Sequence, residues 1–279
     1  MMMAEKIVYV DAFTNRMFSG NPAAVVFLTH PNKSQWMQSI AAETGLSETA
    51  FILPTKGKDN FHIWWFTPTT EAPLCGHATL AAAHALWETT PAAEIAPISF
   101  MSCSGELIAR KHGDWIELDF PSEDAEKITE IPSIILEEFS EQLAFVGLNR
   151  MDFLVELHDD SAVINYQPNF DKLAQLGRGI IITARSNNPH YDFVSRVFAP
   201  SEGIPEDPVT GSAHCCLGPY WSTLLKKDQM IGYQASKRGG VIKVHYKHSR
   251  TLLYGQAVSV MEGHLIQDSS SPTPMNTSI

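Results

Sequence analysis

Two short segments of the sequence combine polar side chains with turns that precede apolar helical patterns. One is "EDPVTGSAHCCLGPYW" at 206–221, and the other is "EAPLCGHATLAAAHALW" at 71–87. In the first, two acids lead into a Thr-Gly-Ser-Ala turn, a His and two adjacent cysteines. These residue types are compatible with four chemistries: a nucleophile turn, a metal site, a redox pair, or a helix start that binds an anion.

The spacing of these residues disfavours three of the four chemistries. Ser212 lacks the x-Gly that completes a nucleophile elbow, because Ala and His follow it. Cys75 and His77 stand two apart without a second ligand pair at the usual spacing, so we expect no metal. Cys215 and Cys216 fall in an apolar helical pattern, where free cysteines pack as small core residues, and neighbouring cysteines are too cramped for an ordinary disulfide. A helix start that binds an anion is the best-supported chemistry.

Each segment predicts a helix that begins at a Gly-x-Ala turn. The first N–H groups of a helix are unpaired and lie at the positive end of its dipole, so they can bind a carboxylate or phosphate. Gly76 and Gly211 allow the backbone to approach a ligand closely. Two such helix starts facing each other would hold a small anionic molecule from both sides. The alternative is that Ser212 is only an N-cap and that the glycines only form turns.

The two segments also belong to longer stretches that match each other. "FTPTTEAPLCGHATLAAAHALW" at 66–87 and "FAPSEGIPEDPVTGSAHCCLGPYW" at 198–221 each give a strand ending in Phe-x-Pro, a loop, and a helix ending near a Trp. This similarity favours an internal duplication, with two similar domains facing across a cleft. We assign residues 1–122 and 123–268 to these domains and 269–279 to a polar tail, and a strand near 255–267 can return to the first domain.

The predicted elements follow the hydrophobic periodicity and the turn residues. In the first half, strands are expected at 6–13, 19–28, 49–54, 61–66 and within 97–120, and helices at 33–45 and 76–88. A polar segment at 121–130 is expected to join the halves. In the second half, helices are expected near 132–143, 170–176 and 212–225, and strands at 153–157, 162–166, 179–184, 191–200 and in several segments up to about 267.

The composition limits the class of partner. The chain of 279 residues carries 20 Lys and Arg against 31 Asp and Glu, a net charge of -11, which argues against a nucleic-acid partner. No stretch approaches the roughly 20 apolar residues of a membrane span, and the N-terminus lacks a signal-peptide core. We therefore expect a cytoplasmic protein that binds a small molecule and has no disulfide framework.

The two Gly-containing turns and several other segments of the sequence resemble those of the PhzF family, the phenazine biosynthesis-like proteins within the wider diaminopimelate epimerase fold. The resemblance runs through nearly the whole chain. It includes "VDAFTNRMFSGNPAAVVFL" at 10–28, "LSETAFILP" at 46–54, "WFTPTTEAPLCGHATLAAA" at 65–83, "FAPSEGIPEDPVTGSAH" at 198–214 and "QASKRGG" at 234–240. It implies an α+β fold of two pseudo-symmetric domains, each a curled, mostly antiparallel, barrel-like sheet around a central helix, with the active site between them.

The resemblance also implies an activity and a set of site residues. The family's isomerase moves a proton between two carbons of a dihydro-hydroxyanthranilate without a cofactor, and relatives are typically homodimers. The implied catalytic residues are Glu48 as acid and base, with His77 and Asp207 as helpers. The implied substrate-binding residues are Asn21, Gly76, Gly211, Ser212, Gly239 and Gly240. Without the resemblance, Glu48 would be interpreted as a carboxylate that caps a nearby backbone turn.

One position departs from the epimerases of this fold, which use two opposed cysteines as bases. Cys75 occupies the first position, but Thr210 occupies the second, and a hydroxyl is far too weak an acid to replace a thiol there. A one-base isomerisation of a small carboxylate is therefore the leading hypothesis. A cysteine-assisted racemase that uses Cys75, and a non-catalytic binding or regulatory protein that keeps the cleft, are the alternatives. Arg238 is expected on a surface hairpin or, alternatively, at the bound anion.

Overall fold

The computed structural model describes residues 5–55, 59–89 and 97–266, so the predicted tail 269–279 lies outside the described residues. The elements of the first half are β1 (Lys6–Ala12), β2 (Asn21–Phe27), α1 (Ser34–Thr44), β3 (Glu48–Pro54), β4 (Asn60–Phe66), β5 (Glu71–Ala72), α2 (Gly76–Thr89), β6 (Ile98–Ser102), β7 (Gly105–His112) and β8 (Trp115–Pro121). Those of the second half are β9 (Glu126–Lys127), α3 (Ser133–Phe139), a 3-10 turn at Ser140–Gln142, β10 (Leu143–Leu148), β11 (Asp152–Leu157), α4 (Asp160–Ile164), α5 (Phe170–Ala174), β12 (Gly179–Arg185), β13 (Phe193–Ala199), a 3-10 turn at Pro200–Glu202, β14 (Ile204–Asp207), α6 (Gly211–Leu225), β15 (Gln229–Gln234), β16 (Gly240–Lys247), β17 (Arg250–Gly255) and β18 (Ala257–His264).

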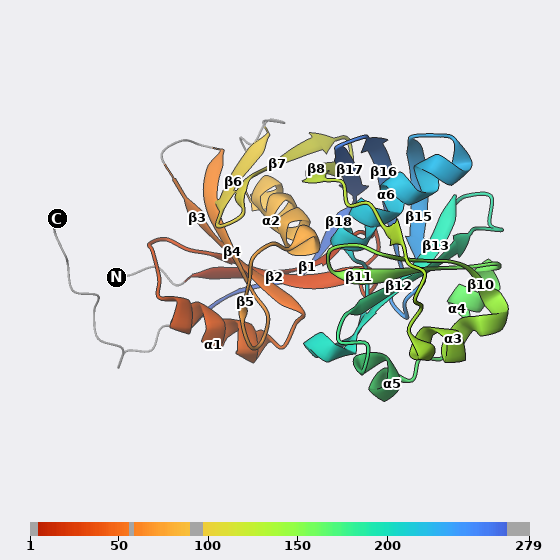
Figure 1. The fold of residues 1–279 in the computed structure, drawn as a ribbon. Coiled ribbons are helices and arrows are strands. Elements are labelled where there is room, and N and C mark those ends of the chain that lie inside the picture. Colours follow the sequence, from red (N-terminus) through yellow and green to blue (C-terminus); the bar gives the residue numbers. More distant parts are fainter. Residues whose placement is uncertain (1–4, 56–58, 90–96, 267–279) are drawn as a thin grey trace.

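The strands of the two halves pair in the same order (Figure 1). In the first half, β1–β2 is antiparallel, β2–β3 parallel, β3–β4 antiparallel and β4–β6 parallel, and β6, β7 and β8 are antiparallel neighbours. The second half repeats this sequence with β10, β11, β12, β13, β15, β16 and β17. Each parallel pair requires a crossover connection, and these connections contain α1 and α2 in one half and α4, α5 and α6 in the other.

The halves join into one curled sheet that does not close on itself. The link is the antiparallel pair β8–β17. In addition, β18 leaves the second half to pair with β1, and β9 follows β8 but pairs with β10 in the second half. The predicted α+β class with a curled, mostly antiparallel sheet in each half is confirmed.

The central helices α2 and α6 lie inside the curl of the sheet. Ten of the 14 residues of α2 are buried, because this Ala-rich helix is apolar on every side. It packs on β1, β2, β3, β8 and β18, while α6 packs on β15, β16 and β17. One hydrophobic cluster contains side chains from both helices, so the halves share a core. The short helices α1, α4 and α5 instead pack into two smaller clusters.

The predicted strand at 162–166 is wrong, because α4 occupies most of this segment. The Asp159 side chain caps the helix by accepting a hydrogen bond from the Ser161 amide at 2.8 Å. Val163 is fully buried in the cluster beside β12 and β13. The β-branched residues of the segment predicted a strand. The segment instead belongs to the crossover connection that joins the parallel strands β11 and β12.

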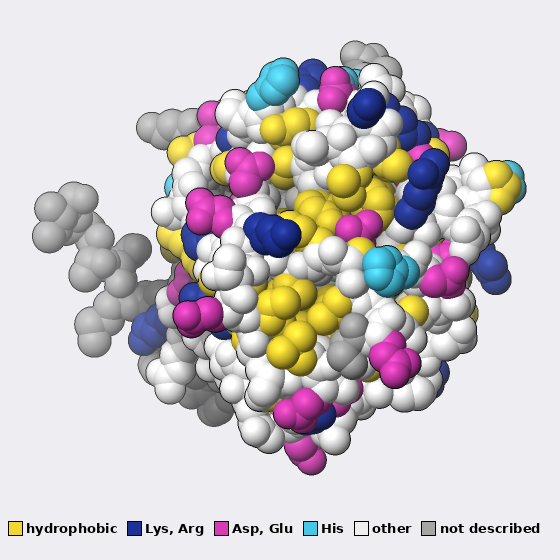
Figure 2. Space-filling model, turned by 45° about the vertical axis from the view of Figure 1, so that its right-hand side comes forward, with side chains coloured by type: hydrophobic (Ala, Val, Ile, Leu, Met, Phe, Trp, Pro, Cys, Tyr) yellow, Lys and Arg dark blue, Asp and Glu magenta, His cyan; other side chains and the backbone are white. Residues whose placement is uncertain are grey.

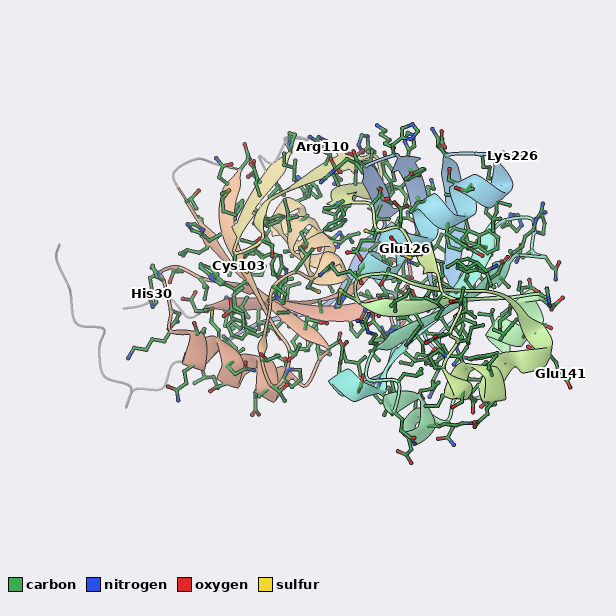
Figure 3. All side chains as sticks on the ribbon, in the orientation of Figure 1. His30, Cys103, Arg110, Glu126, Glu141 and Lys226 are labelled. Atoms are coloured by element: carbon green, nitrogen blue, oxygen red, sulfur yellow. The ribbon has the colours of Figure 1, made fainter. Side chains whose placement is uncertain are left out.

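The charges on the surface agree with the composition, which argues against a nucleic-acid partner. On the face shown in Figure 2, acidic and basic side chains are interspersed around a central group of hydrophobic ones, and its described residues form no continuous basic stripe. Figure 3 labels charged side chains on different sides of the molecule, such as Arg110 at the top and Glu141 at the lower right. Within the described ranges, every helix is too short or too polar to cross a bilayer.

Asp152, at the start of β11, gives a prediction on stability. It is 8% exposed, and burial, together with the nearby Glu202 and Glu123, raises its pKa to about 6. Because this native pKa lies above the ordinary aspartate value, the native state binds the proton more tightly than the unfolded chain does. Ionisation of Asp152 therefore lowers stability as the pH rises through about 6.

The variant Asp152→Asn keeps the side-chain shape but cannot ionise. At neutral and higher pH its free energy of unfolding should exceed that of the wild type by about 1–3 kcal/mol. The difference should shrink as the pH falls through about 6, where the wild-type carboxyl takes up its proton. Urea unfolding of both proteins over this pH range measures the difference, and a less stable variant at neutral pH would contradict the prediction.

Candidate active site

The two Gly-containing turns meet where the halves join. A Cβ atom placed on Gly76 would lie 3.6 Å from the Cα atom of Gly211, and the reverse distance is also 3.6 Å. The starts of α2 and α6 therefore lie close together, near the centre of the molecule in Figure 1. A single methyl group added at either glycine would fill the space between the two helix starts at ordinary contact distance.

Glu48 and Asn21 lie near these helix starts because each begins one of two adjacent parallel strands. Asn21 is the first residue of β2, Glu48 is the first of β3, and Ala23 is the register partner of Glu48. Ser47, just before β3, donates a hydrogen bond to Asn21 Oδ1 at 3.3 Å. Parallel pairing thus places a carboxylate, a hydroxyl and an amide at one edge of the sheet.

His77, the second residue of α2, connects these groups. Its Nε2 lies 3.3 Å from Glu48 Oε2 and 3.4 Å from Ser47 Oγ. Its Nδ1 lies 3.2 Å from Asn21 Nδ2 and 3.5 Å from Cys75 Sγ. The His77 side chain is 6% exposed and that of Glu48 is 14% exposed, so Glu48 is the more accessible member of the pair.

Asp207 comes from the second half and completes the group. Asn21 Nδ2 donates to Asp207 Oδ1 at 2.8 Å and to the Val209 carbonyl at 2.9 Å. The Thr210 hydroxyl donates to Asp207 Oδ2. Asn21 is thus hydrogen-bonded across the boundary between the halves, and it fixes the second turn against the edge that holds Glu48.

A glutamine from β15 supports the second turn. Gln234 Oε1 accepts from the Thr210 amide at 2.8 Å, and Gln234 Nε2 donates to the Asp207 carbonyl at 2.7 Å. The ring nitrogen Nδ1 of His214 lies 2.8 Å from the Thr210 carbonyl. Gln234 and His214 are both fully buried, so the turn that carries Asp207 is held by groups shielded from water.

Burial sets the electrostatics of the site. It raises the pKa of Glu48, and a hydrogen bond from Ser47 partly offsets the rise. It also raises the pKa of Asp207, against the lowering effects of His77 and Thr210. Burial lowers the pKa of His77, although Asp207 opposes that change. Glu48 therefore holds a proton more tightly than an exposed glutamate does, and His77 holds one less tightly than an exposed histidine does.

Cys75 lies directly before α2 and its thiol is buried. Burial raises the pKa of Cys75 well above its ordinary value, Glu48 adds to the rise, and the amides of Ala78 and His77 partly oppose it. The thiol is therefore protonated at neutral pH. Thr210, at the matching position of the second turn, donates its hydroxyl to Asp207.

The remaining predicted residues have different surroundings. Ser212 is exposed in the first turn of α6, next to the contact between the helix starts. Gly239 and Gly240 are buried: a Cβ on Gly239 would lie 2.5 Å from the Tyr233 hydroxyl, and one on Gly240 would lie 2.4 Å from the Val209 side chain. Their contact with substrate stays a prediction.

Sequence reasoning missed two polar residues of this region, Ser47 and Gln234, and did not predict the contacts of Arg238. Ser47 and Gln234 lie inside the segments that carried the resemblance, and each stands at a strand end, which was the available signal. Arg238 pairs with buried Asp11 at 2.6 Å and donates to the carbonyls of Ser19 and Gly20. Neither expectation for Arg238, a surface hairpin or an anion contact, included this pairing.

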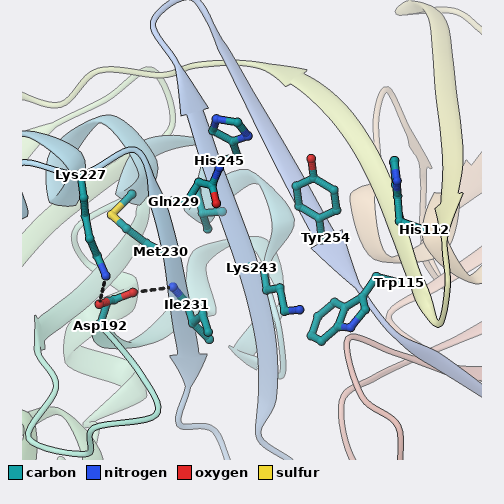
Figure 4. A pocket seen from close by; sticks show the side chains of 11 residues that line it. His112, Trp115, Asp192, Lys227, Gln229, Met230, Ile231, Lys243, His245 and Tyr254 are labelled. Carbon is teal, nitrogen blue, oxygen red and sulfur yellow. Dashed lines mark hydrogen bonds and ion pairs between the residues drawn. The ribbon is translucent and has the colours of Figure 1, made fainter.

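Away from the helix starts, a concavity of about 580 Å³ is lined by β15, β16, β17 and the β7–β8 hairpin (Figure 4). Lys243 Nζ lies 3.7 Å from the centroid of the Trp115 ring. Asp192 pairs with Lys227 and accepts a hydrogen bond from the Ile231 amide. Lys243, Asp192 and Lys227 in this groove have neighbours that match their charge, whereas the helix-start site holds a partly exposed carboxylate beside a buried histidine. The helix-start site is the better candidate for catalysis.

Comparison with known proteins places the chain in a family. The sequence profile of the PhzC-PhzF family, described as phenazine biosynthesis-like protein, matches residues 10–263. The chain belongs to the PhzC-PhzF family. The match spans both helix starts as well as Glu48 and Asp207, so the candidate site lies inside the region that defines membership of this family.

Relatives in sequence and structure agree with this membership. An uncharacterized isomerase of Halalkalibacterium halodurans is 49% identical over 266 residues, which cover 95% of this chain and all of the relative. A crystal structure of a PhzF-family protein from Enterococcus faecalis superposes with a TM-score of 0.89 at 37% identity, covering 95% of this chain and all of that one. A probable proline racemase from Agrobacterium radiobacter, with a TM-score of 0.66 at 10% identity over 96% of this chain and 94% of its own, shares the fold alone. The resemblance seen in the sequence is confirmed.

Proposed function

We propose that this PhzC-PhzF-family protein is a cofactor-independent isomerase that moves a carbon-bound proton within a small carboxylate substrate held between its two halves. Its isomerase class follows from relatives that carry that name. The observation that carries the proposed mechanism is the position of Glu48. Its carboxylate is partly exposed beside the junction of α2 and α6, lies 3.3 Å from His77, and has a pKa raised by burial.

A single carboxylate can perform both halves of such an isomerisation. Ionised Glu48 removes a proton from carbon, so the C–H bond breaks, an O–H bond forms, and the electron pair moves into the adjacent unsaturated system. The protonated Glu48 then returns the proton to another carbon on the same face. A raised pKa favours this role, because the conjugate acid of Glu48 persists long enough to deliver the proton.

The neighbours of Glu48 have separate roles in this proposal. His77, near Glu48 Oε2, positions the carboxylate, and Asp207 holds Asn21 and the second turn in place. The first amides of α6 are the proposed seat of the substrate carboxylate, because the Thr210 hydroxyl bonds to Asp207 instead of capping this helix. Exposed Ser212 adds a hydroxyl beside these amides. Buried Cys75, whose raised pKa keeps it protonated, does not favour the cysteine-assisted racemase.

The proposal predicts exchange of a carbon-bound hydrogen with solvent. We expect NMR in D₂O to show enzyme-dependent loss of a C–H signal from some members of a panel of small carboxylic acids. The panel contains α-amino acids, α-hydroxy acids and a dihydro-hydroxyanthranilate. The methyl ester of each active acid is the matched control, and its exchange should be much slower because it lacks the charge that the helix start binds. Equal exchange of acid and ester, or none in the whole panel, would count against the proposal.

A further inference from the structure

Three side chains of different types bring metal-binding atoms together at the helix-start site. They are Glu48 at the start of β3, and Cys75 and His77 at the start of α2. One ligand atom from each lies within 4.8 Å of the others. The sequence-based expectation of no metal considered only the Cys75–His77 spacing, and the fold supplies the third ligand from a distant strand.

The distances fit a tetrahedral thiophilic cation. Zinc binds sulfur at about 2.3 Å and nitrogen or oxygen at about 2.0–2.1 Å, so tetrahedral ligand pairs lie about 3.3 Å apart for N and O and about 3.6 Å apart for N and S. Glu48 Oε2 and His77 Nε2 are 3.3 Å apart, which matches. Cys75 Sγ and His77 Nε2 are 4.0 Å apart, so a side-chain adjustment of about 0.4 Å brings this pair to the tetrahedral distance, and the ligand atoms of Glu48 and Cys75 lie within 4.8 Å of each other.

The charge of the site also favours a cation. Glu48 and Asp207 are two carboxylates of one side-chain network, in which His77 lies next to Glu48 and Asn21 lies between His77 and Asp207. Arg238 is hydrogen-bonded to Asp11 and to two carbonyls. A divalent cation bound by one thiolate, one carboxylate and one imidazole would offset the negative charge of the two anionic ligands.

We propose that Glu48, Cys75 and His77 form a binding site for a thiophilic divalent cation such as Zn²⁺, and that an ion bound there blocks the proton transfer. On binding, the S–H bond of Cys75 breaks, the S–Zn bond forms, and the proton leaves to solvent. No oxidation or reduction occurs. The fourth tetrahedral position stays open to water or to the substrate carboxylate. Only the inhibitory part of this proposal rests on the proposed function, because it requires Glu48 to be the base.

Cobalt provides a direct probe of the thiolate ligand. Chelator-treated protein titrated with Co²⁺ should bind one equivalent and develop the near-ultraviolet charge-transfer absorption of a cobalt–thiolate bond, and Zn²⁺ should displace it. Cys75→Ala should abolish the absorption and weaken Zn²⁺ binding in calorimetry by about 100-fold. Cys103→Ser is the matched control, since Cys103 is exposed in the turn between β6 and β7 and is labelled in Figure 3. This control should behave as the wild type does.

Two further measurements keep the test decisive. Glu48→Gln retains the thiol and the side-chain shape, and it should weaken Zn²⁺ binding while keeping the cobalt–thiolate absorption. Absence of that absorption in the wild type, or its survival in folded Cys75→Ala, would overturn the site.

Stoichiometric Zn²⁺ should also suppress deuterium exchange in an active acid from the panel. Tight zinc binding with unchanged exchange would overturn the inhibition, whereas exchange that never occurs refutes the proposed function and leaves the binding result standing.

Discussion

Glu48→Gln is expected to lower the rate of deuterium exchange into an active carboxylic acid by about 10²–10⁴-fold. Glutamine matches glutamate in shape and can still make a hydrogen bond to His77, but it cannot accept a proton from carbon at neutral pH. Binding of the acid, measured by calorimetry, should change much less than the rate, because the proposed carboxylate seat lies on α6. The loss should therefore appear in kcat more than in KM.

The matched control for this variant is Glu43→Gln. Glu43 is exposed on α1, so Glu43→Gln makes the same chemical change outside the proposed catalytic group. Exchange at the wild-type rate in Glu43→Gln together with loss in Glu48→Gln assigns the effect to the position and not to the altered net charge. Undiminished exchange in Glu48→Gln would remove this carboxylate from the mechanism.

Arg238→Ala is expected to lower the free energy of unfolding by about 3–5 kcal/mol. The guanidinium of Arg238 contacts Asp11 at 2.6 Å and the carbonyls of Ser19 and Gly20 at 2.9 and 2.8 Å. The Asp11 side chain is only 4% exposed. Removing the arginine leaves a buried carboxylate whose remaining described partner is the Phe18 amide, and such a group is costly to keep ionised without a counter-charge.

An exposed ion pair of the same type supplies the control. Arg250 pairs with Asp119 at 2.8 Å, but the two side chains are 44% and 34% exposed. Arg250→Ala should therefore cost at most about 1 kcal/mol. Urea denaturation of both variants measures the difference. Similar small losses in the two would show that Arg238 does not stabilise the contact of the 235–239 turn with β1 and with the segment that leads to Asn21.

The two stability predictions test opposite consequences of burying a carboxylate. Asp152 is a buried acid whose neighbours include other acids, so removing its charge should stabilise the protein. Asp11 is a buried acid with a matched guanidinium, so removing its partner should destabilise the protein. The sign depends on the neighbouring groups, which come from elements far apart in the chain.

Local patterns were sufficient for most of the secondary structure. The Ala-rich run after Gly76 gave the buried helix α2, and Gly45, at φ 65°, ends α1 where the sequence predicted a stop. The strand prediction for 162–166 was wrong because the β-branched residues of this segment favour a strand locally. Its real conformation depends on the crossover between β11 and β12, which periodicity does not report.

The candidate site also has features that the sequence predicts and features that only the structure reveals. The family resemblance in the sequence named Glu48, His77 and Asp207 as candidate catalytic residues, and the two matching Gly-x-Ala turns had already marked the segments that carry His77 and Asp207. Only the tertiary structure decided which groups touch: Asn21 joins Asp207 across the halves, Gln234 holds Thr210, Arg238 neutralises Asp11, and Glu48 comes within reach of Cys75 and His77. The physical reason is that side-chain type and backbone preference are local properties of a chain. Hydrogen bonds, burial and charge pairing between distant segments depend on how the two halves of the sheet fold against each other.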